Sequence, residues 1–420
     1  MELKGSKTNI HFHSGVLTIG GTIIEVSYGK ARIFFDFGTE FVPSLKLPDE
    51  SLQTLLAHRL VPELDHVYDP RLGYMEKTPA NDMETAVFIS HCHLDHTRMV
   101  NYLDPKIPLY VLEETKVLLN SLNANGTFLL PSADGSKTRE MTGLPNEAIV
   151  HVGEISVELQ RVDHDAYGAC GLLIQTPDMR IAYTGDLRLH GTDREDTIRF
   201  CEKAKHADAL IMEGVSISFD DHKEPGITSE AELIRKFTEI VKQYEGKQVT
   251  FQTYPGNVKR LAAIIANAPR QVVVEASYAY ILKSCLGLET PYYSVTDPVE
   301  YALNEELQIA YETLLEDEHQ YVWQVVQDFA KLKGGGVYIH SDATPLGDFD
   351  PAYQPFVNQF AEHDITFTRL GCSGHAVPKD LDEIVDRIAP KLLLPIHSLH
   401  PERLENNHGS RHLPTRGEKL

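Results

Sequence analysis

The feature that most constrains this chain is the hexad His91-Cys92-His93-Leu94-Asp95-His96, which directly follows the apolar run 86–89. A short apolar run of this kind predicts a buried strand. Side chains alternate along an extended segment, so His91 and His93 point the same way. A helix that begins near Asp95 aims Asp95 and His96 at a neighbouring point. Because ligands at the end of a rigid strand have fixed positions, the hexad predicts two adjacent ligand pairs, spaced for two metal ions.

Other candidate ligands also follow predicted strands. Histidines scattered at random would not all fall at strand ends, so this shared position predicts a single site. The residues are Asp36 after 33–35, His164 after the alternating run 155–162, Asp186 after 180–184, and His397 after 391–396.

Composition excludes several classes of protein. The formal net charge of −22 over 420 residues argues against a broad surface that binds polyanions non-specifically. It leaves room for a local cationic groove at bound divalent ions. The first residues lack an apolar leader and no long apolar run occurs, so neither secretion nor membrane spanning is expected. The five scattered cysteines predict reduced thiols and a cytoplasmic protein.

The pattern of elements changes near residue 215. Residues 15–36 alternate apolar runs with glycine, as in a β-meander. From Ser229, which opens the capping-box pattern Ser229-x-x-Glu232, strands alternate with helices, and this predicts a parallel, doubly wound sheet. The acidic region 299–333, which contains Trp323, is predicted to be helical. Motifs typical of a site return near residue 371.

The hexad and the later motifs resemble those of the β-CASP branch of the metallo-β-lactamase superfamily, whose members include ribonuclease J. The resemblance covers the whole chain. It implies an α/β fold: an αββα metallo-β-lactamase sandwich that carries an inserted doubly wound α/β β-CASP domain. The sandwich is predicted to comprise 1–214 and 371–420, and the insert 215–370.

The resemblance also implies a role for each motif residue. Asp36 is expected to support the site by hydrogen bonding, and Ser373, Gly374 and Ser341 to contact substrate. His91, His93 and His164 resemble the ligands of one metal, and Asp95, His96 and His397 those of the second, with Asp186 bridging them. Asp95, Glu213, His375 and His397 are the expected catalytic residues.

These motifs favour a metal-dependent phosphodiester hydrolase, specifically a ribonuclease in which a hydroxide activated by two metals attacks phosphorus. His375, in a glycine turn, is the candidate proton donor or phosphate contact, and Glu213 could raise its pKa. The N/O ligand set suits Zn²⁺, with Mn²⁺ as the alternative. In this branch a histidine in the position of His397 accompanies activity on RNA, so single-stranded RNA is the expected partner ahead of DNA.

Two other functions stay open. One is a di-zinc hydrolase of a small phosphodiester or acyl ester, which the acidic composition supports. The other is a non-catalytic RNA-binding protein that retains a metal site. The segment Asp163-His164-Asp165-Ala166-Tyr167-Gly168 departs from the Ser/Pro-containing loop of ribonuclease J, so substrate contacts there are expected to differ. A homodimer is the default expectation for assembly.

Overall fold

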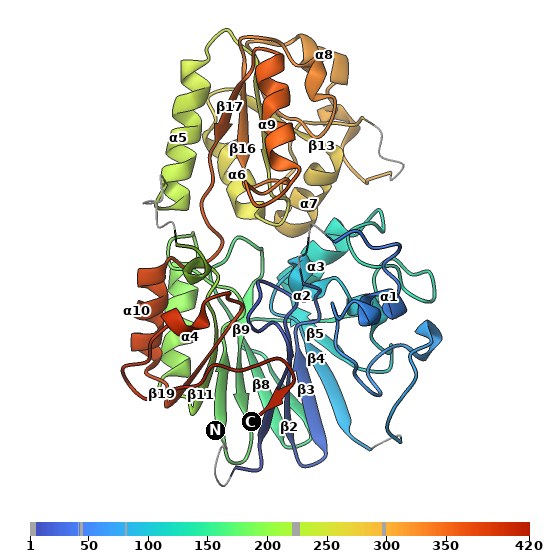
Figure 1. Cartoon of the computed structure of the whole chain (residues 1–420). Helices are drawn as coiled ribbons and strands as arrows, with labels where there is room; N and C mark the ends of the chain where they lie inside the picture. Colours follow the sequence, from blue (N-terminus) through green and yellow to red (C-terminus); the bar gives the residue numbers. More distant parts are fainter. Residues whose placement is uncertain (1–5, 41, 43–44, 80–81, 221–226, 296–299) are drawn as a thin grey trace. The chain divides into compact units, whose positions relative to one another are not determined.

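The chain forms two compact units, of which residues 1–222 with 374–420 are unit 1 and residues 223–373 are unit 2 (Figure 1). The structure is a computed structural model that describes residues 6–40, 42, 45–79, 82–220, 227–295 and 300–420. The boundaries inferred from sequence at 214/215 and 370/371 stay predictions of the domain division.

Unit 1 is built around two seven-stranded sheets, ordered β20-β1-β2-β3-β4-β5-β6 and β19-β18-β11-β10-β9-β8-β7. The strands of the first sheet are β1 (Asn9–Ser14), β2 (Ile23–Tyr28), β3 (Ala31–Phe35), β4 (Glu84–Phe88), β5 (Leu109–Leu112), β6 (Thr142–Leu144) and β20 (Glu418–Lys419). Those of the second are β7 (Ile149–Val152), β8 (Ile155–Arg161), β9 (Cys170–Gln175), β10 (Arg180–Tyr183), β11 (Ala209–Glu213), β18 (Leu392–Ile396) and β19 (Ser410–Arg411).

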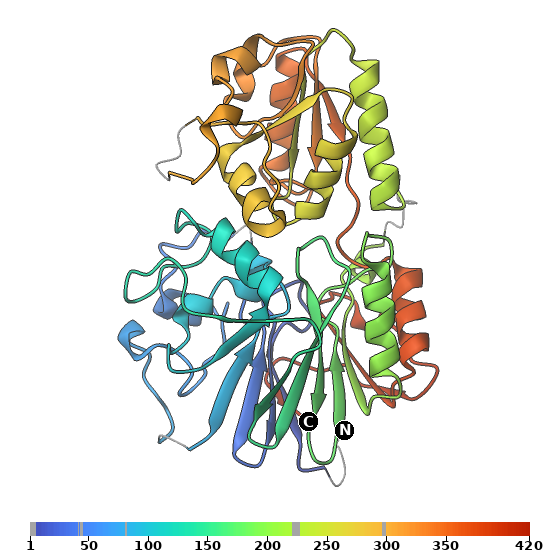
Figure 2. The same ribbon diagram turned by 180° about the vertical axis from the view of Figure 1, so that it is seen from behind.

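Helices cover the outer faces of both sheets, as Figure 1 and the reverse view in Figure 2 show. Side chains such as Phe35 and Ile211 meet in the core between the sheets. A second core, which includes Phe200 and Ile384, joins the second sheet to its helices. These layers are the αββα sandwich that the sequence predicted. The helices are α1 (Leu52–Ala57), α2 (Leu94–Thr97), α3 (Glu113–Leu122), α4 (Arg194–Ala204) and α10 (Pro378–Ile388).

The direction of the strands explains why the candidate ligands gather. In the first sheet β3 and β4 run parallel. In the second, β10, β11 and β18 run parallel, and β8 shares their direction because both β8 and β10 are antiparallel to β9. Parallel strands of one sheet end at the same edge, so the segments that follow them are brought together.

Unit 2 contains a six-stranded sheet, ordered β14-β13-β15-β12-β16-β17, in which every recorded pairing is parallel. This is the predicted α/β insert with a parallel sheet. Its strands are β12 (Val249–Thr253), β13 (Gln271–Glu275), β14 (Tyr292–Tyr293), β15 (Tyr321–Gln324), β16 (Val337–Ser341) and β17 (Thr366–Arg369). Its helices are α5 (Glu230–Gln243), α6 (Val258–Asn267), α7 (Ala276–Leu286), α8 (Tyr311–Glu316) and α9 (Tyr353–Glu362).

Two predictions about local structure in unit 2 had different outcomes. Ser229 caps α5 by accepting a hydrogen bond from the Glu232 amide, as the capping pattern predicted. The prediction of helix across 299–333 was wrong, because Trp323 is fully buried in β15, and among the described residues 300–333 only α8 and short 3₁₀ turns are helical. No helix among the described residues is long and apolar enough to cross a membrane.

Candidate metal centre

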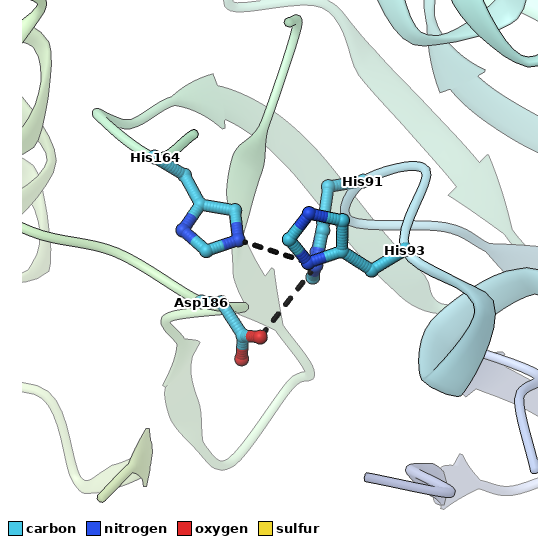
Figure 3. A group of neighbouring side chains, drawn as sticks. All are labelled: His91, His93, His164 and Asp186. Atoms are coloured by element: carbon cyan, nitrogen blue, oxygen red, sulfur yellow. Dashed lines mark hydrogen bonds and ion pairs between the residues drawn. The ribbon is translucent and has the colours of Figure 1, made fainter. Parts of the chain in front are cut away.

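Four side chains from three strand ends point toward one another in unit 1 (Figure 3). His91 and His93 follow β4, His164 follows β8, and Asp186 follows β10. One ligand atom from each of the four lies within 4.8 Å of those of the other three. The Nε2 atom of His164 is 3.3 Å from Nδ1 of His93, and Nε2 of His91 is 3.5 Å from Oδ2 of Asp186. We call these four residues the first ligand group.

A second ligand group shares Asp186 with the first. It consists of Asp95, His96, Asp186 and His397, whose ligand atoms also lie within 4.8 Å of one another. The Nε2 atom of His96 lies 3.2 Å from Asp186 Oδ2, and Nε2 of His397 lies 3.3 Å from Asp95 Oδ2. His397 has the left-handed backbone conformation, with φ of 50°, which a residue with a Cβ adopts only under strain of about 1–3 kcal/mol.

The donor atoms of these groups fit divalent metal ions. The Nε2 atoms of His91, His96 and His397 and Oδ2 of Asp186 are buried and have no hydrogen-bond partner. Buried polar atoms almost always have one, so these four atoms need another occupant. The Nε2 atoms of His91 and His96 lie 3.5 and 3.2 Å from Asp186 Oδ2, close to the edge of about 3.3 Å of a tetrahedron with metal–nitrogen arms of about 2.0–2.1 Å.

One buried carboxylate, Asp36, orients a histidine in each group. It accepts hydrogen bonds from Nδ1–H of His96 at 2.7 Å, from the Ser90 amide at 2.7 Å and hydroxyl at 2.8 Å, and from the Tyr183 hydroxyl. Because the Ser90 hydroxyl donates its only hydrogen to Asp36, it accepts from Nδ1–H of His91 at 2.9 Å. Both Nδ1 atoms are therefore protonated, and Nε2 is the nitrogen that each ring turns toward the other ligands.

The glycine turn before α10 holds His164. The Gly374 carbonyl accepts a hydrogen bond from Nδ1–H of His164 at 2.5 Å, which again leaves Nε2 free to bind a metal. A Cβ at position 374 would lie 2.4 Å from Oδ1 of Asp165, so only glycine fits beside that carboxylate. Asp165 Oδ1 lies 3.4 Å from Nε2 of His93 and 3.3 Å from Nε2 of His164.

Glu213 and His375 form a hydrogen-bonded pair at the edge of the second group. Nδ1 of His375 is 3.2 Å from Oε1 of Glu213 and 3.8 Å from Oδ2 of Asp186. Glu213 is 1% exposed, and its carboxylate also accepts the amide of Val215 at 2.9 Å. The side chain of His375 is 22% exposed, so it can meet a bound molecule, whereas Glu213 cannot.

Electrostatics separate the histidines into two kinds. Burial lowers the pKa of His164 to about 3 and that of His91 well below its usual value, so both are neutral. Burial opposes protonation of His375 as well, but the Glu213 and Asp186 carboxylates prevail and raise its pKa to about 9. His91 and His164 thus offer lone pairs, whereas the carboxylates beside His375 favour its protonated form.

The structure brings together nearly all the residues singled out from sequence. Glu213, His375, Gly374 and both ligand groups lie in unit 1, and exposed Ser373 is the last residue of unit 2. Ser341 ends β16 of unit 2, where its buried hydroxyl accepts a hydrogen bond from Arg260 at 3.3 Å. Sequence reasoning missed Ser90, Tyr183 and Asp165, although an acidic residue next to a predicted ligand was a signal for Asp165.

An αββα sandwich with two adjoining His/Asp groups at one edge defines the class: a metallo-β-lactamase-fold hydrolase with a divalent-metal site. A family model described as "Beta-lactamase superfamily domain" matches residues 68–242. The chain is 55% identical to a protein of unknown function from Enterococcus faecalis V583. That protein's crystal structure superposes with a TM-score of 0.96, covering 99% of this chain and 100% of the other.

Three more distant relatives are ribonucleases J. Ribonuclease J of Mycoplasma genitalium is 21% identical over 93% of this chain and 68% of its own length. Ribonuclease J of Thermus thermophilus is 24% identical over 94% of this chain and 70% of its own. Ribonuclease J of Helicobacter pylori is 22% identical over 96% of this chain and 56% of its own length. The chain thus matches a metallo-β-lactamase superfamily domain over part of its length and is similar to ribonucleases J over most of it, which agrees with the predicted β-CASP branch.

Proposed function

We propose that this chain is a metal-dependent ribonuclease that uses two divalent ions, Zn²⁺ by preference and Mn²⁺ as the alternative. The observation that carries the proposal is the set of buried, unpartnered donor atoms on His91, His96, His397 and Asp186. His91, His93 and His164 hold one ion, Asp95, His96 and His397 hold the other, and Asp186 belongs to both ligand sets. When bound, such ions lower the pKa of water and neutralise a phosphodiester oxygen.

The residues of the chain supply the remaining steps. The carboxylate of Glu213 raises the pKa of His375 and so favours a ring that holds a proton to give. Its 22% exposure lets it donate a proton to the leaving oxygen or contact a phosphate. Glu213 keeps the ring in place through the hydrogen bond at 3.2 Å. Ser373, Gly374 and Ser341 stay predicted substrate contacts.

The choice of RNA rests on the relatives. The curated relatives named above are called ribonuclease J, and His397 occupies the position that accompanies RNA-directed activity in this branch. DNA is the weaker candidate. A cytoplasmic location and a homodimer stay predictions.

The test compares three substrates on the purified full chain loaded with Zn²⁺ or Mn²⁺: a labelled single-stranded RNA, the same sequence as DNA, and a small chromogenic phosphodiester. We expect faster cleavage of RNA than of DNA, and its loss in Asp186→Asn. A matched control is Asp386→Asn, whose carboxylate is 60% exposed on α10 and should leave cleavage unchanged. RNA cleavage that survives Asp186→Asn would contradict the mechanism.

Asp165 favours a second candidate, the hydrolase of a small or less anionic ester. Its carboxylate lies within 3.4 Å of two histidines of the first ligand group, and it adds a negative charge where a polyanionic substrate would approach. Through its contact with Nε2 of His93 it would leave Nδ1 as the nitrogen available to a metal ion. If the small ester is the natural substrate, Asp165→Ser will raise RNA cleavage relative to chromogenic diester cleavage. If RNA is the natural substrate, the ratio of RNA cleavage to chromogenic diester cleavage will stay constant or fall in Asp165→Ser.

A further inference from the structure

A third group of metal-binding side chains lies on a different part of unit 1. In β1, Ile10 and Phe12 are fully buried in the core between the two sheets. Side chains alternate along a strand, so His11 and His13 lie on the opposite face. Across the sheet His11 is paired with Glu25 of β2, which places that carboxylate beside both imidazoles.

These three side chains are close enough to share one cation. A nitrogen of each histidine and a carboxylate oxygen of Glu25 lie within 4.8 Å of one another. The two imidazole centroids are 3.8 Å apart, and Nε2 of His13 is 3.0 Å from Oε2 of Glu25. The side chains of His13 and Glu25 are only 10% and 15% exposed, so little solvent competes for the donor atoms.

The surroundings determine which cations suit the group. His11 is also paired with Lys419 of β20. Arg32 of β3 acts on Glu25 electrostatically while its guanidinium lies 5.2 Å from the Phe34 ring. One carboxylate in a group that also has Arg32 and Lys419 as neighbours gives little net attraction for Mg²⁺ or Ca²⁺, which depend on oxygen ligands. Two imidazoles instead favour borderline transition-metal ions, which often bind two histidines and one carboxylate.

We propose that His11, His13 and Glu25 bind one divalent transition-metal ion, such as Zn²⁺ or Ni²⁺, at a site that shares no residue with the two ligand groups around Asp186. The ligands come from the adjacent strands β1 and β2. The cationic neighbours Lys419 and Arg32 come from β20 and β3, which flank these two strands. A bound ion therefore ties β1 to β2 near the strand β20 that pairs with β1. Its expected role is to stabilise unit 1, and this inference does not depend on the proposed function.

The experiment counts metal equivalents in the full-length protein. In the Asp186→Asn background, which weakens the main centre, isothermal titration with Zn²⁺ is compared with the further variants His11→Gln/His13→Gln and Glu25→Gln. We expect the double histidine variant to bind one equivalent fewer than its parent. Glu25→Gln, a milder change to the fold, should bind the same ion at least several-fold more weakly. Titration with Mg²⁺ should show no binding that depends on these residues.

A matched control separates this site from ordinary histidine–carboxylate pairs. His408 lies 2.9 Å from Asp386 but belongs to an exposed pair without a second histidine, so His408→Gln should lose no equivalent. The proposal is overturned if the histidine double variant binds as many Zn²⁺ equivalents as its parent, or if His408→Gln loses as much. Unchanged binding in Glu25→Gln would remove the carboxylate from the site and overturn the three-ligand assignment.

Discussion

Two buried clusters of charged side chains, one in each unit, differ in how their polar atoms are satisfied. In unit 2 the guanidinium of Arg260 donates to Glu230 at 2.9 and 2.7 Å, to Asp342 at 2.6 Å and to the Cys372 carbonyl at 2.9 Å. In unit 1 the donor atoms of His91, His96, His397 and Asp186 converge without hydrogen bonds. The first cluster is complete by itself and holds the fold, whereas the second needs a ligand.

The same contrast appears between single histidines. His340 in unit 2 is fully buried, but it accepts a hydrogen bond from Tyr338 at 3.1 Å and donates one to the Pro345 carbonyl at 2.9 Å. His91 is equally buried and has a partner only for Nδ1. Burial therefore does not identify a ligand, but a buried ring nitrogen without a partner that points at other such atoms does.

The largest effect should come from the residue shared by both ligand groups. Asp186→Asn is expected to lower hydrolysis by about 10³-fold or more, because even outer-shell partners of metal sites are worth about 10–100-fold. In the presence of chelator the same change should lower the free energy of unfolding only slightly, because the imidazoles of His96 and His397 that face Asp186 can release their protons once it is neutral. Rate assays and urea unfolding with chelator measure the two quantities. A loss of several kcal/mol in chelator would make this cluster structural.

The cluster in unit 2 should respond in the opposite way. Arg260→Met is expected to lower the free energy of unfolding by about 3–5 kcal/mol, because it leaves two carboxylates without their cation, while metal content stays unchanged. The control is Arg235→Met on α5, whose pair with Glu239 is exposed by 57% and 50% and should change stability by less than about 1 kcal/mol. Chemical denaturation and elemental analysis check both parts. Equal losses in the two variants would refute the distinction.

A smaller effect is expected from the hydrogen bonds behind the ligands. Ser90→Ala breaks the link between Asp36 and His91, so the metal affinity of the first group should fall by about 10–100-fold. Ser121→Ala is the matched control, because this nearly buried hydroxyl donates only to the Val117 carbonyl of its own helix. Competition with a metal-binding dye measures the affinities. If Ser90→Ala binds as tightly as the control, the proposed orientation of His91 is wrong.

The smallest effect concerns pH and His340. Burial lowers the pKa of His340 below its ordinary value of 6.5, so below that pH the unfolded chain takes up a proton that the folded chain refuses. Stability should therefore fall as pH decreases through 6.5 toward the folded pKa. His340→Gln should make this acid-side slope shallower. Denaturation curves of both proteins between neutral and mildly acidic pH supply the comparison, and identical slopes would contradict it.

Much of the centre could be predicted because its ligands follow strands. The hexad, His164, Asp186 and His397 each come after an apolar run, and parallel strands bring such positions together. The network behind them could not be read in the same way, because Ser90 and Tyr183 have ordinary residue types and meet Asp36 only through the packing of two sheets. The region around Trp323 was wrongly predicted to be helical for a related reason. β15 is buried on both faces, so its apolar residues do not alternate, and they resemble a helix.

The order in which the chain is made has a consequence for the cell. His397 follows β18, which pairs with β11 inside the second sheet, and its backbone amide donates to the Gly15 carbonyl near the start of the chain. The second ligand group is therefore complete only after β18 has been synthesised and has paired with β11. Under the proposed function, a chain interrupted before β18 would lack His397 and with it one ligand of the second group, so we expect such a fragment to be inactive.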